Sequence, residues 1–178
     1  MDRDLSLAIL KAYRAVQSVW PTLNPDLEAR AATWEQLDAR ALNDELARLV
    51  DETNRPGCDL RVFWKLGAEL TYGGCNARFA QDAGFPAAEQ IVGKNDFDPT
   101  ISWLRQSPKY RADDNEVIKL GAERLNIIER QRSAQGNIWL RTAKAPICPA
   151  GGAAVGVVGM YEVIDVQAAI QLNPALGA

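Results

Sequence analysis

The chain contains no histidine, and this absence removes several kinds of chemistry at once. Histidine is the commonest general base at neutral pH, a frequent metal ligand and the usual axial ligand of haem. A cysteine nucleophile would lack its imidazole partner. The sequence also has no Gly-x-x-x-x-Gly-Lys-Ser/Thr loop and no Gly-x-Gly-x-x-Gly loop to hold phosphate groups. We therefore expect neither catalytic residues nor metal ligands, and predict that the protein is not an enzyme.

Cysteine is scarce and shows no pairing pattern. The three cysteines are Cys58, Cys75 and Cys148, an odd number without a C-x-x-C pair. Such a set indicates neither a disulfide framework nor a structural zinc site. Free thiols are the ordinary state in a reducing compartment. The cysteine content therefore predicts a cytoplasmic protein.

The sequence also lacks an excess of positive charge and a long apolar run. Its formal net charge is −3, its pI is near 5.1, and lysine and arginine are scattered among acids. Without a broad basic field, we expect no nucleic-acid partner. The longest nearly uncharged run, residues 145–161, contains two prolines and four glycines. It is shorter than the ~20 residues of a spanning helix, so we expect no membrane partner either.

Residues 1–54 have the pattern of an amphipathic helical extension. Apolar residues recur at spacings of three and four over residues 5–20, and this helix should end before Pro21. A second apolar stripe covers residues 34–49, and Thr33 opens a possible capping box. Two helices cannot bury such stripes on their own. The extension should therefore cover an open sheet face, form a dimer interface, or do both.

Beyond Asn54 the pattern changes to short strand-like runs separated by turn residues. We expect a domain over residues 55–166 and an exit segment over residues 167–178. The main helix of this domain should have Ser107 as its N-cap and Pro108 in its first turn, and Gly121 should end it. The pattern predicts an α+β fold, with a five-stranded antiparallel sheet and helices on one face. The expected strands cover residues 60–65, 69–73, 123–131, 137–147 and 154–164.

Two segments carry a family signature, Cys75-Asn76-Ala77-Arg78-Phe79-Ala80 and Ile91-Val92-Gly93-Lys94-Asn95-Asp96-Phe97-Asp98. In the first, Asn76 can cap a short helix. In the second, Gly93 can adopt a positive φ and the aspartates can hold a turn. Together with the strands between Val62 and Asp165, these segments resemble the PAS family of sensory domains.

The PAS resemblance implies a pocket between the sheet and its helices. The strand face that carries Leu140 and Tyr161 would line this pocket, and the opposite face would need a cover. A mainly apolar cavity with a few polar points is typical of a ligand site. The predicted ligand-binding residues are Phe79, Phe97, Trp103, Tyr110, Asp114, Val117, Ile127, Leu140, Thr142 and Tyr161.

Asp114 is the one carboxylate in this set. Helical spacing places it four residues after Tyr110, on the face that should meet the sheet. A buried carboxylate needs a partner. Arg141 or Lys144 would supply one within the protein, and a donor on a ligand is the alternative.

The resemblance also bears on the cofactor, whose identity the sequence leaves unknown. In LOV domains, the flavin-binding photosensors of the PAS family, the cysteine that forms the light-driven adduct follows Gly-Arg/Lys-Asn. Here Asp96 holds that place. Leu140 and Tyr161 stand where LOV domains carry a flavin-gripping amide and a glutamine. These residues argue against a LOV adduct, and the lack of histidine argues against haem. A small organic ligand is preferred to FAD.

By resemblance, the chain is expected to be a sensory or regulatory module in signal transduction. It would bind a small molecule or cofactor and transmit occupancy through its flanking helices. The alternatives are a ligand-free PAS module for protein interaction and dimerisation, and an FAD-based redox sensor. The expected partners are a second copy, bound through the N-terminal helices and the outer sheet face, and a signalling effector domain or protein.

Overall fold

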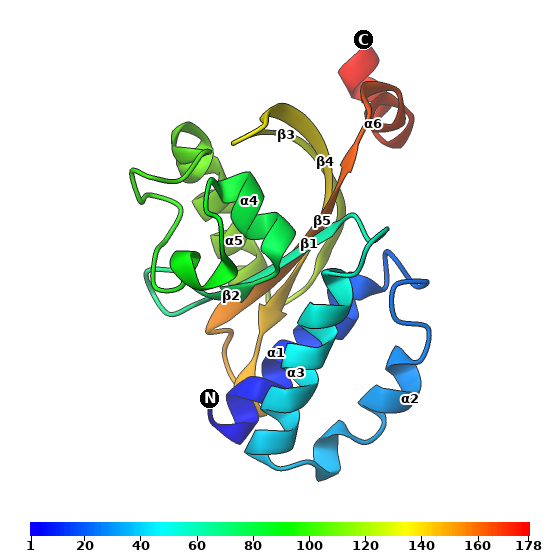
Figure 1. The fold of residues 1–178 in the computed structure, drawn as a ribbon, viewed down its shortest axis with the longest axis vertical. Helices are drawn as coiled ribbons and strands as arrows, with labels where there is room; N and C mark the ends of the chain where they lie inside the picture. Colours follow the sequence, from blue (N-terminus) through cyan, green and yellow to red (C-terminus); the bar gives the residue numbers. More distant parts are fainter.

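A sheet of five antiparallel strands lies at the centre of the computed structural model, which describes residues 1–178 (Figure 1). The strand order is β2-β1-β5-β4-β3, so the last strand of the chain lies between the first strand and the β3–β4 hairpin. The predicted α+β class and antiparallel sheet are confirmed. The strands are β1 (Leu60–Leu66), β2 (Thr71–Cys75), β3 (Arg124–Ser133), β4 (Gly136–Ile147) and β5 (Gly156–Ile164).

Helices α4 and α5 cover one face of the sheet (Figure 1). Pro108 lies in the first turn of α5, and Gly121 ends it in the left-handed conformation, as predicted. Ser107 was predicted to be the N-cap and is not. It is the first helical residue, and its hydroxyl donates to the backbone carbonyl of Asp96. The elements of this layer are α4 (Ala77–Ala83), η2 (Ala88–Ile91), η3 (Leu104–Gln106) and α5 (Ser107–Leu120).

The N-terminal helices cover the opposite face, which is the intramolecular cover predicted for the extension (Figure 1). They are α1 (Arg3–Gln17), α2 (Leu27–Ala31), η1 (Trp34–Gln36) and α3 (Ala39–Thr53). The second predicted helix is therefore divided. Thr33 makes no capping hydrogen bond, whereas the Asp38 carboxylate accepts from the Ala41 amide at 2.8 Å and begins α3.

Alternation along β4 separates the two layers. Leu140, Thr142 and Lys144 face α4 and α5, while Ala143 and Ala145 belong to the apolar cluster formed with α1 and α3. Small alanine side chains let α1 approach the strand backbone closely. One residue step along β4 therefore separates the two helical layers.

Asn76 ties both layers to the sheet and is fully buried. Its side-chain oxygen accepts from the amides of Phe79 at 3.1 Å, as the predicted cap of α4, and of Val62 at 3.2 Å. Its amide group donates to the Leu60 carbonyl at 2.8 Å and to the Thr53 hydroxyl at 3.0 Å. One side chain thus connects α4, β1 and the end of α3.

The chain ends in two short helices, α6 (Val166–Leu172) and η5 (Pro174–Gly177). Asp165 caps α6 by accepting from the Ala168 amide at 2.7 Å. Both helices lie beyond the sheet, at the end of the molecule opposite the N-terminus (Figure 1).

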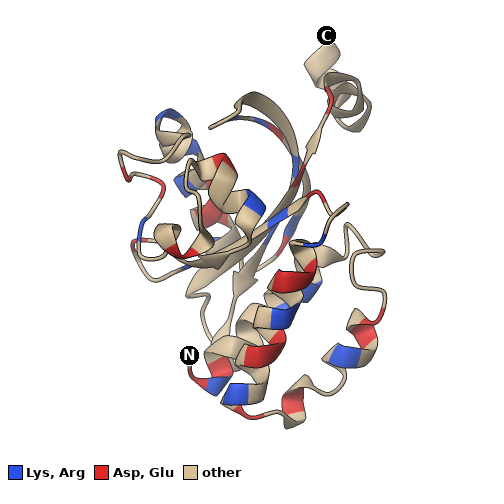
Figure 2. Ribbon diagram, in the orientation of Figure 1, with Lys and Arg blue, Asp and Glu red and all other residues tan.

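Charge and hydrophobicity of the helices complete the description. Positive and negative residues occur together on the helices of both layers (Figure 2). None of the helices combines the length and the apolar character that crossing a bilayer requires.

The four hydrogen bonds of Asn76 generate a stability prediction. Asn76→Ala should lower the free energy of unfolding by about 2–4 kcal/mol, because it leaves buried backbone groups unpaired and removes a helix cap. Urea unfolding followed by circular dichroism measures this loss. The matched control is Asn115→Ala on the exposed side of α5, expected to change stability by less than about 0.5 kcal/mol. Equal effects of the two substitutions would contradict the role assigned to Asn76.

Candidate ligand-binding site

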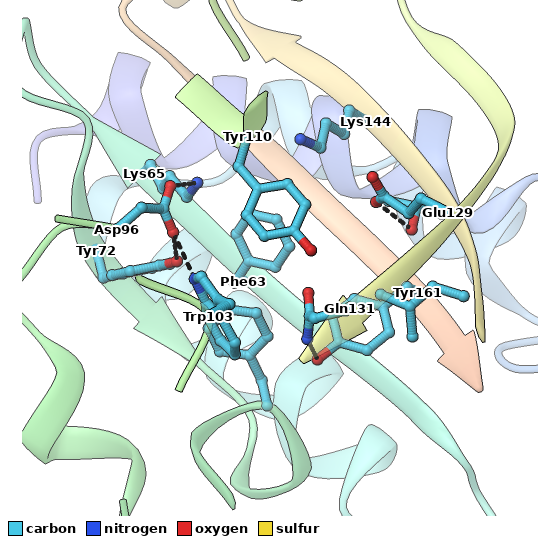
Figure 3. Close-up of a pocket in the computed structure, with 13 residues that line it drawn as sticks. Phe63, Lys65, Tyr72, Asp96, Trp103, Tyr110, Glu129, Gln131, Lys144 and Tyr161 are labelled. Atoms are coloured by element: carbon cyan, nitrogen blue, oxygen red, sulfur yellow. Dashed lines mark hydrogen bonds and ion pairs between the residues drawn. The ribbon is translucent and has the colours of Figure 1, made fainter. Parts of the chain in front are cut away.

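A small cavity of about 20 Å³ lies between the sheet and helices α4 and α5 (Figure 3). This volume is enough for about one water molecule. Its wall is half aromatic and half polar. The aromatic side chains are Phe63, Tyr72, Phe79, Trp103, Tyr110 and Tyr161, and the others are Lys65, Asp96, Glu129, Gln131, Leu140, Thr142 and Lys144.

Four buried charges form a chain along one wall, which we call the ionic quartet: Lys65, Asp96, Asp114 and Lys144. The Lys65 ammonium pairs with the Asp96 carboxylate and lies 2.6 Å from Oδ2 of Asp114. The Lys144 ammonium lies 2.7 Å from Oδ1 of the same Asp114. No member is more than 3% exposed. The quartet connects β1, β4, α5 and the loop before η3.

Mutual attraction favours the charged forms of Asp114 and Lys65 despite their burial. Burial by itself would raise the pKa of Asp114, but Lys144 and Lys65 hold it below its ordinary value. Burial would likewise lower the pKa of Lys65, and Asp114 and Asp96 instead raise it. The two ammonium groups of the quartet are paired with its two carboxylates, so its formal net charge is zero.

Asp96 anchors the loop before α5, although the sequence suggested only a turn residue. Its carboxylate also accepts from the Tyr72 hydroxyl and, at 2.9 Å, from the indole N–H of Trp103. Burial and the nearby Asp96 raise the pKa of Tyr72 well above its ordinary value, so the hydroxyl stays a donor. The turn role belongs to Asp98, which accepts from the Thr100 amide at 2.9 Å.

Glu129 on β3 is the fifth buried charge at the cavity and is 7% exposed. It accepts from the Thr142 hydroxyl at 3.1 Å and pairs with the Lys109 ammonium at 2.8 Å. Its charge is therefore also compensated within the protein.

A further hydrogen-bonded chain closes the cavity beside α4. The Tyr161 hydroxyl donates to the Asp82 carboxylate at 2.7 Å and accepts weakly from the Gln131 amide at 3.4 Å. Asp82 in turn pairs with the Arg61 guanidinium at 3.0 Å. Tyr161 is therefore fixed from α4, β1 and β3 together.

Six of the ten predicted site residues line the cavity: Phe79, Trp103, Tyr110, Leu140, Thr142 and Tyr161. Asp114 stands directly behind two lining lysines. Of its two predicted partners, the structure places Lys144 there. Arg141 faces the other way, with its guanidinium over the Trp20 ring.

Three residues were expected at the cavity and lie elsewhere. Phe97 is 43% exposed and packs against Arg111, because the Asn95 side chain accepts from the Phe97 amide and turns Asp96 inward instead. Val117 is buried about two turns beyond Tyr110 on α5. Ile127 is half-buried on β3, next to a register shift and beyond Glu129.

The residues that the sequence reasoning missed are mainly charged or amide side chains at inward strand positions. Strand alternation could have identified them, because every second residue of a strand lies on the same face of the sheet. In β4, Lys144 shares a face with Leu140 and Thr142, which were both predicted to face inward. The lining residues absent from the predicted set are Phe63, Lys65, Tyr72, Asp96, Glu129, Gln131 and Lys144. Of these, Lys144 was predicted only as a partner of Asp114.

No protein-family model matches the chain, and no curated protein matches it in sequence. Solved structures match its fold. Phage VqmA in complex with DPO is 16% identical, with a TM-score of 0.54 over 78% of this chain and 59% of that one. Vibrio cholerae VqmA in complex with ligand and DNA is 17% identical, with a TM-score of 0.53 over 74% of this chain and 58% of that one. An RNA-binding LOV receptor is 14% identical, with a TM-score of 0.55 over 78% and 38%.

At these identities the comparison establishes the fold alone. The LOV domain belongs to the PAS family, so the fold predicted from the two signature segments agrees with the solved structures. The chain spans less than two thirds of the length of each of the three proteins. The chain therefore has a PAS-like fold.

The prediction about partners is wrong. It excluded nucleic acid from the low net charge, yet one similar protein is solved with DNA and another is an RNA-binding receptor. A low net charge therefore does not by itself exclude a nucleic-acid partner. Of the predicted dimer surface, the outer sheet face is covered by α1 and α3 within the chain. A dimer through the N-terminal helices stays a prediction.

The branching of the ionic quartet generates a mutational prediction. Lys65→Met leaves two buried carboxylates without their shared cation and should cost about 3–5 kcal/mol. Lys144→Met leaves Asp114 paired with Lys65 and should cost less, about 1–3 kcal/mol. Urea unfolding of the two variants tests the order. A smaller loss for Lys65→Met than for Lys144→Met would contradict the arrangement.

The quartet also predicts how stability depends on pH. The pKa of Asp114 is lower in the folded chain than its ordinary 3.8, so its stabilisation is complete above about pH 4 and is lost as pH falls through the folded value. The pKa of Lys65 is raised above 10.5, so its contribution is complete below that pH and is lost only on further alkalinisation. Urea unfolding should give a lower free energy at pH 3 than at pH 7. An increase towards pH 3 would contradict this account.

Proposed function

We propose that this chain is a sensory module that binds a small organic molecule in the cavity and transmits occupancy across the sheet to α1 and α3. Support comes first from the fold, which it shares with VqmA, solved as a complex with DPO, and with a LOV receptor. The observation that carries the proposal is the concentration of buried charge at the cavity.

Packing alone does not account for that charge. The quartet and Glu129 are five ionisable side chains, each at most 7% exposed. Replacing buried ion pairs by apolar residues of similar volume is often neutral or stabilising. A ligand site, by contrast, needs a few fixed polar groups in an otherwise aromatic wall. The composition of this cavity wall fits the second requirement.

A ligand would have to widen the cavity. Pockets for small molecules usually have volumes of roughly 300–1,000 Å³, much more than the 20 Å³ seen here. The sheet is held from behind by α1 and α3, so the wall formed by Trp103 and α5 is the part that can move. Binding would then stabilise an open state over the closed one.

The signal would cross the sheet by two routes. Lys144 belongs to the quartet, while its neighbours Ala143 and Ala145 pack in the cluster with α1. Asn76 caps α4 and also donates to Thr53 at the end of α3. A displacement of β4 or α4 therefore reaches the N-terminal helices through a single residue.

The cavity does not fit a LOV-type flavin adduct. Asp96 occupies the adduct cysteine's place and is paired with Lys65, and no thiol lines the cavity. A flavin ring system also exceeds a 20 Å³ space by far.

The small volume favours a second candidate, a ligand-free protein-interaction module whose cavity is filled by its own side chains. In such a module the quartet would fix one packing of α5 on the sheet.

Release of a bound molecule decides between the two candidates. Purified protein incubated with a metabolite extract, washed and denatured should release one small organic molecule per chain, identified by mass spectrometry and absorption spectroscopy. Leu140→Trp fills the cavity and should release none. The matched control Leu120→Trp, at a 62% exposed position of α5, should release the same molecule as wild type. Folded wild-type protein that releases nothing would favour the interaction module.

A further inference from the structure

Tyr110 presents the one cavity-lining hydroxyl that has no partner. It projects from α5 into the cavity and is 5% exposed (Figure 3). Its oxygen is buried and makes no hydrogen bond. The other two tyrosines of the wall donate to carboxylates, Tyr72 to Asp96 and Tyr161 to Asp82. A buried hydroxyl left unpaired is costly, so this group requires a partner inside the cavity.

The hydroxyl can offer this partner a hydrogen for bonding. Burial, and then the charges of Glu129, Asp96 and Asp113, raise the pKa of Tyr110 far above its ordinary 10. The group is therefore protonated at neutral pH. A hydrogen-bond acceptor on a ligand would satisfy it.

The cavity wall offers no uncompensated charge to a ligand. The quartet sums to zero, and Glu129 is paired with Lys109. An anion or cation in this space would lose its hydration without gaining an opposite free charge. The charge balance therefore selects a neutral molecule.

The arrangement of the aromatic side chains in the cavity wall favours a flat ligand. The Phe79 ring lies 5.3 Å from the Trp103 ring and 6.0 Å from the Tyr161 ring, centroid to centroid, in tilted and edge-on arrangements. Aromatic rings arranged in this way present both faces and edges to a further ring.

We infer that the cavity takes a small, neutral, aromatic molecule with a hydrogen-bond acceptor, and that the Tyr110 hydroxyl donates to that acceptor. The inference rests on the proposed function and adds the chemical class of the ligand. Tyr110 is then the residue that distinguishes acceptor-bearing rings from plain hydrocarbon rings.

Four probes of similar size test the inference with the full chain: acetophenone, a neutral acceptor; ethylbenzene, neutral without an acceptor; benzoate, an anion; and benzylamine, a cation. Titrations followed by amide chemical shifts in NMR give each dissociation constant. Acetophenone should bind most tightly. Tyr110→Phe should weaken acetophenone about 3- to 10-fold, the range of one buried hydrogen bond, and change ethylbenzene less than about 2-fold.

The controls separate loss of the donor from loss of structure. Tyr110→Phe breaks no hydrogen bond within the protein, so its spectrum without probe should remain that of a folded chain. Tyr13→Phe removes a hydroxyl that donates to Asn24 in the N-terminal layer, and should leave acetophenone binding unchanged.

Two results would overturn the inference and leave a ligand site in place: tighter binding of benzoate or benzylamine than of acetophenone, or acetophenone binding that does not depend on Tyr110. The second result would mean that water alone satisfies the hydroxyl. Absence of binding by all four probes at millimolar concentration would contradict the inference, whereas the proposed function is tested separately by the molecule released from the extract.

Discussion

The ammonium group of Lys65, held between the carboxylates of Asp96 and Asp114, is the interaction on which the rest of this structure depends. It joins the first strand of the sheet to the loop before α5 and to α5 itself. Each carboxylate also has a second partner, Tyr72 for Asp96 and Lys144 for Asp114. Removing the shared cation would still leave under-compensated negative charge buried on two elements at once. The small cavity is therefore shaped by electrostatics as much as by aromatic packing.

The same interaction explains how one face of the sheet can affect the other. In a strand, successive side chains point to opposite faces, so Lys65 and Lys144 at the cavity have strand neighbours that pack against the N-terminal helices. Lys144 with Ala143 and Ala145 is one example, and Asn76 with Thr53 is a second route that bypasses the strands. A sensor built on this fold needs no long pathway between its cavity and its helical cover.

Much of the fold could be predicted from local patterns. Strand alternation grouped the residues of each sheet face, and the PAS resemblance assigned the face with Leu140 and Tyr161 to the cavity. Turn and cap residues such as Asn76 and Gly121 bounded the helices correctly. The site was harder, because partners such as Lys65 and Asp114 are 49 residues apart and no local pattern pairs them. Asp96 points inward instead of the predicted Phe97, because the Asn95 side chain accepts a hydrogen bond from the Phe97 amide and so orients this part of the loop. Charged residues in strands are normally read as solvated, which hid the polar wall.

Hydrogen exchange of the wild-type chain, with and without saturating acetophenone, tests the central claim most directly. If the cavity binds an acceptor-bearing ring and is coupled across the sheet, backbone amides should exchange more slowly in α4 and α5 and also in α1 and α3. Protection confined to α4 and α5 would contradict the coupling, and unchanged exchange throughout would contradict binding of an acceptor-bearing ring in the cavity.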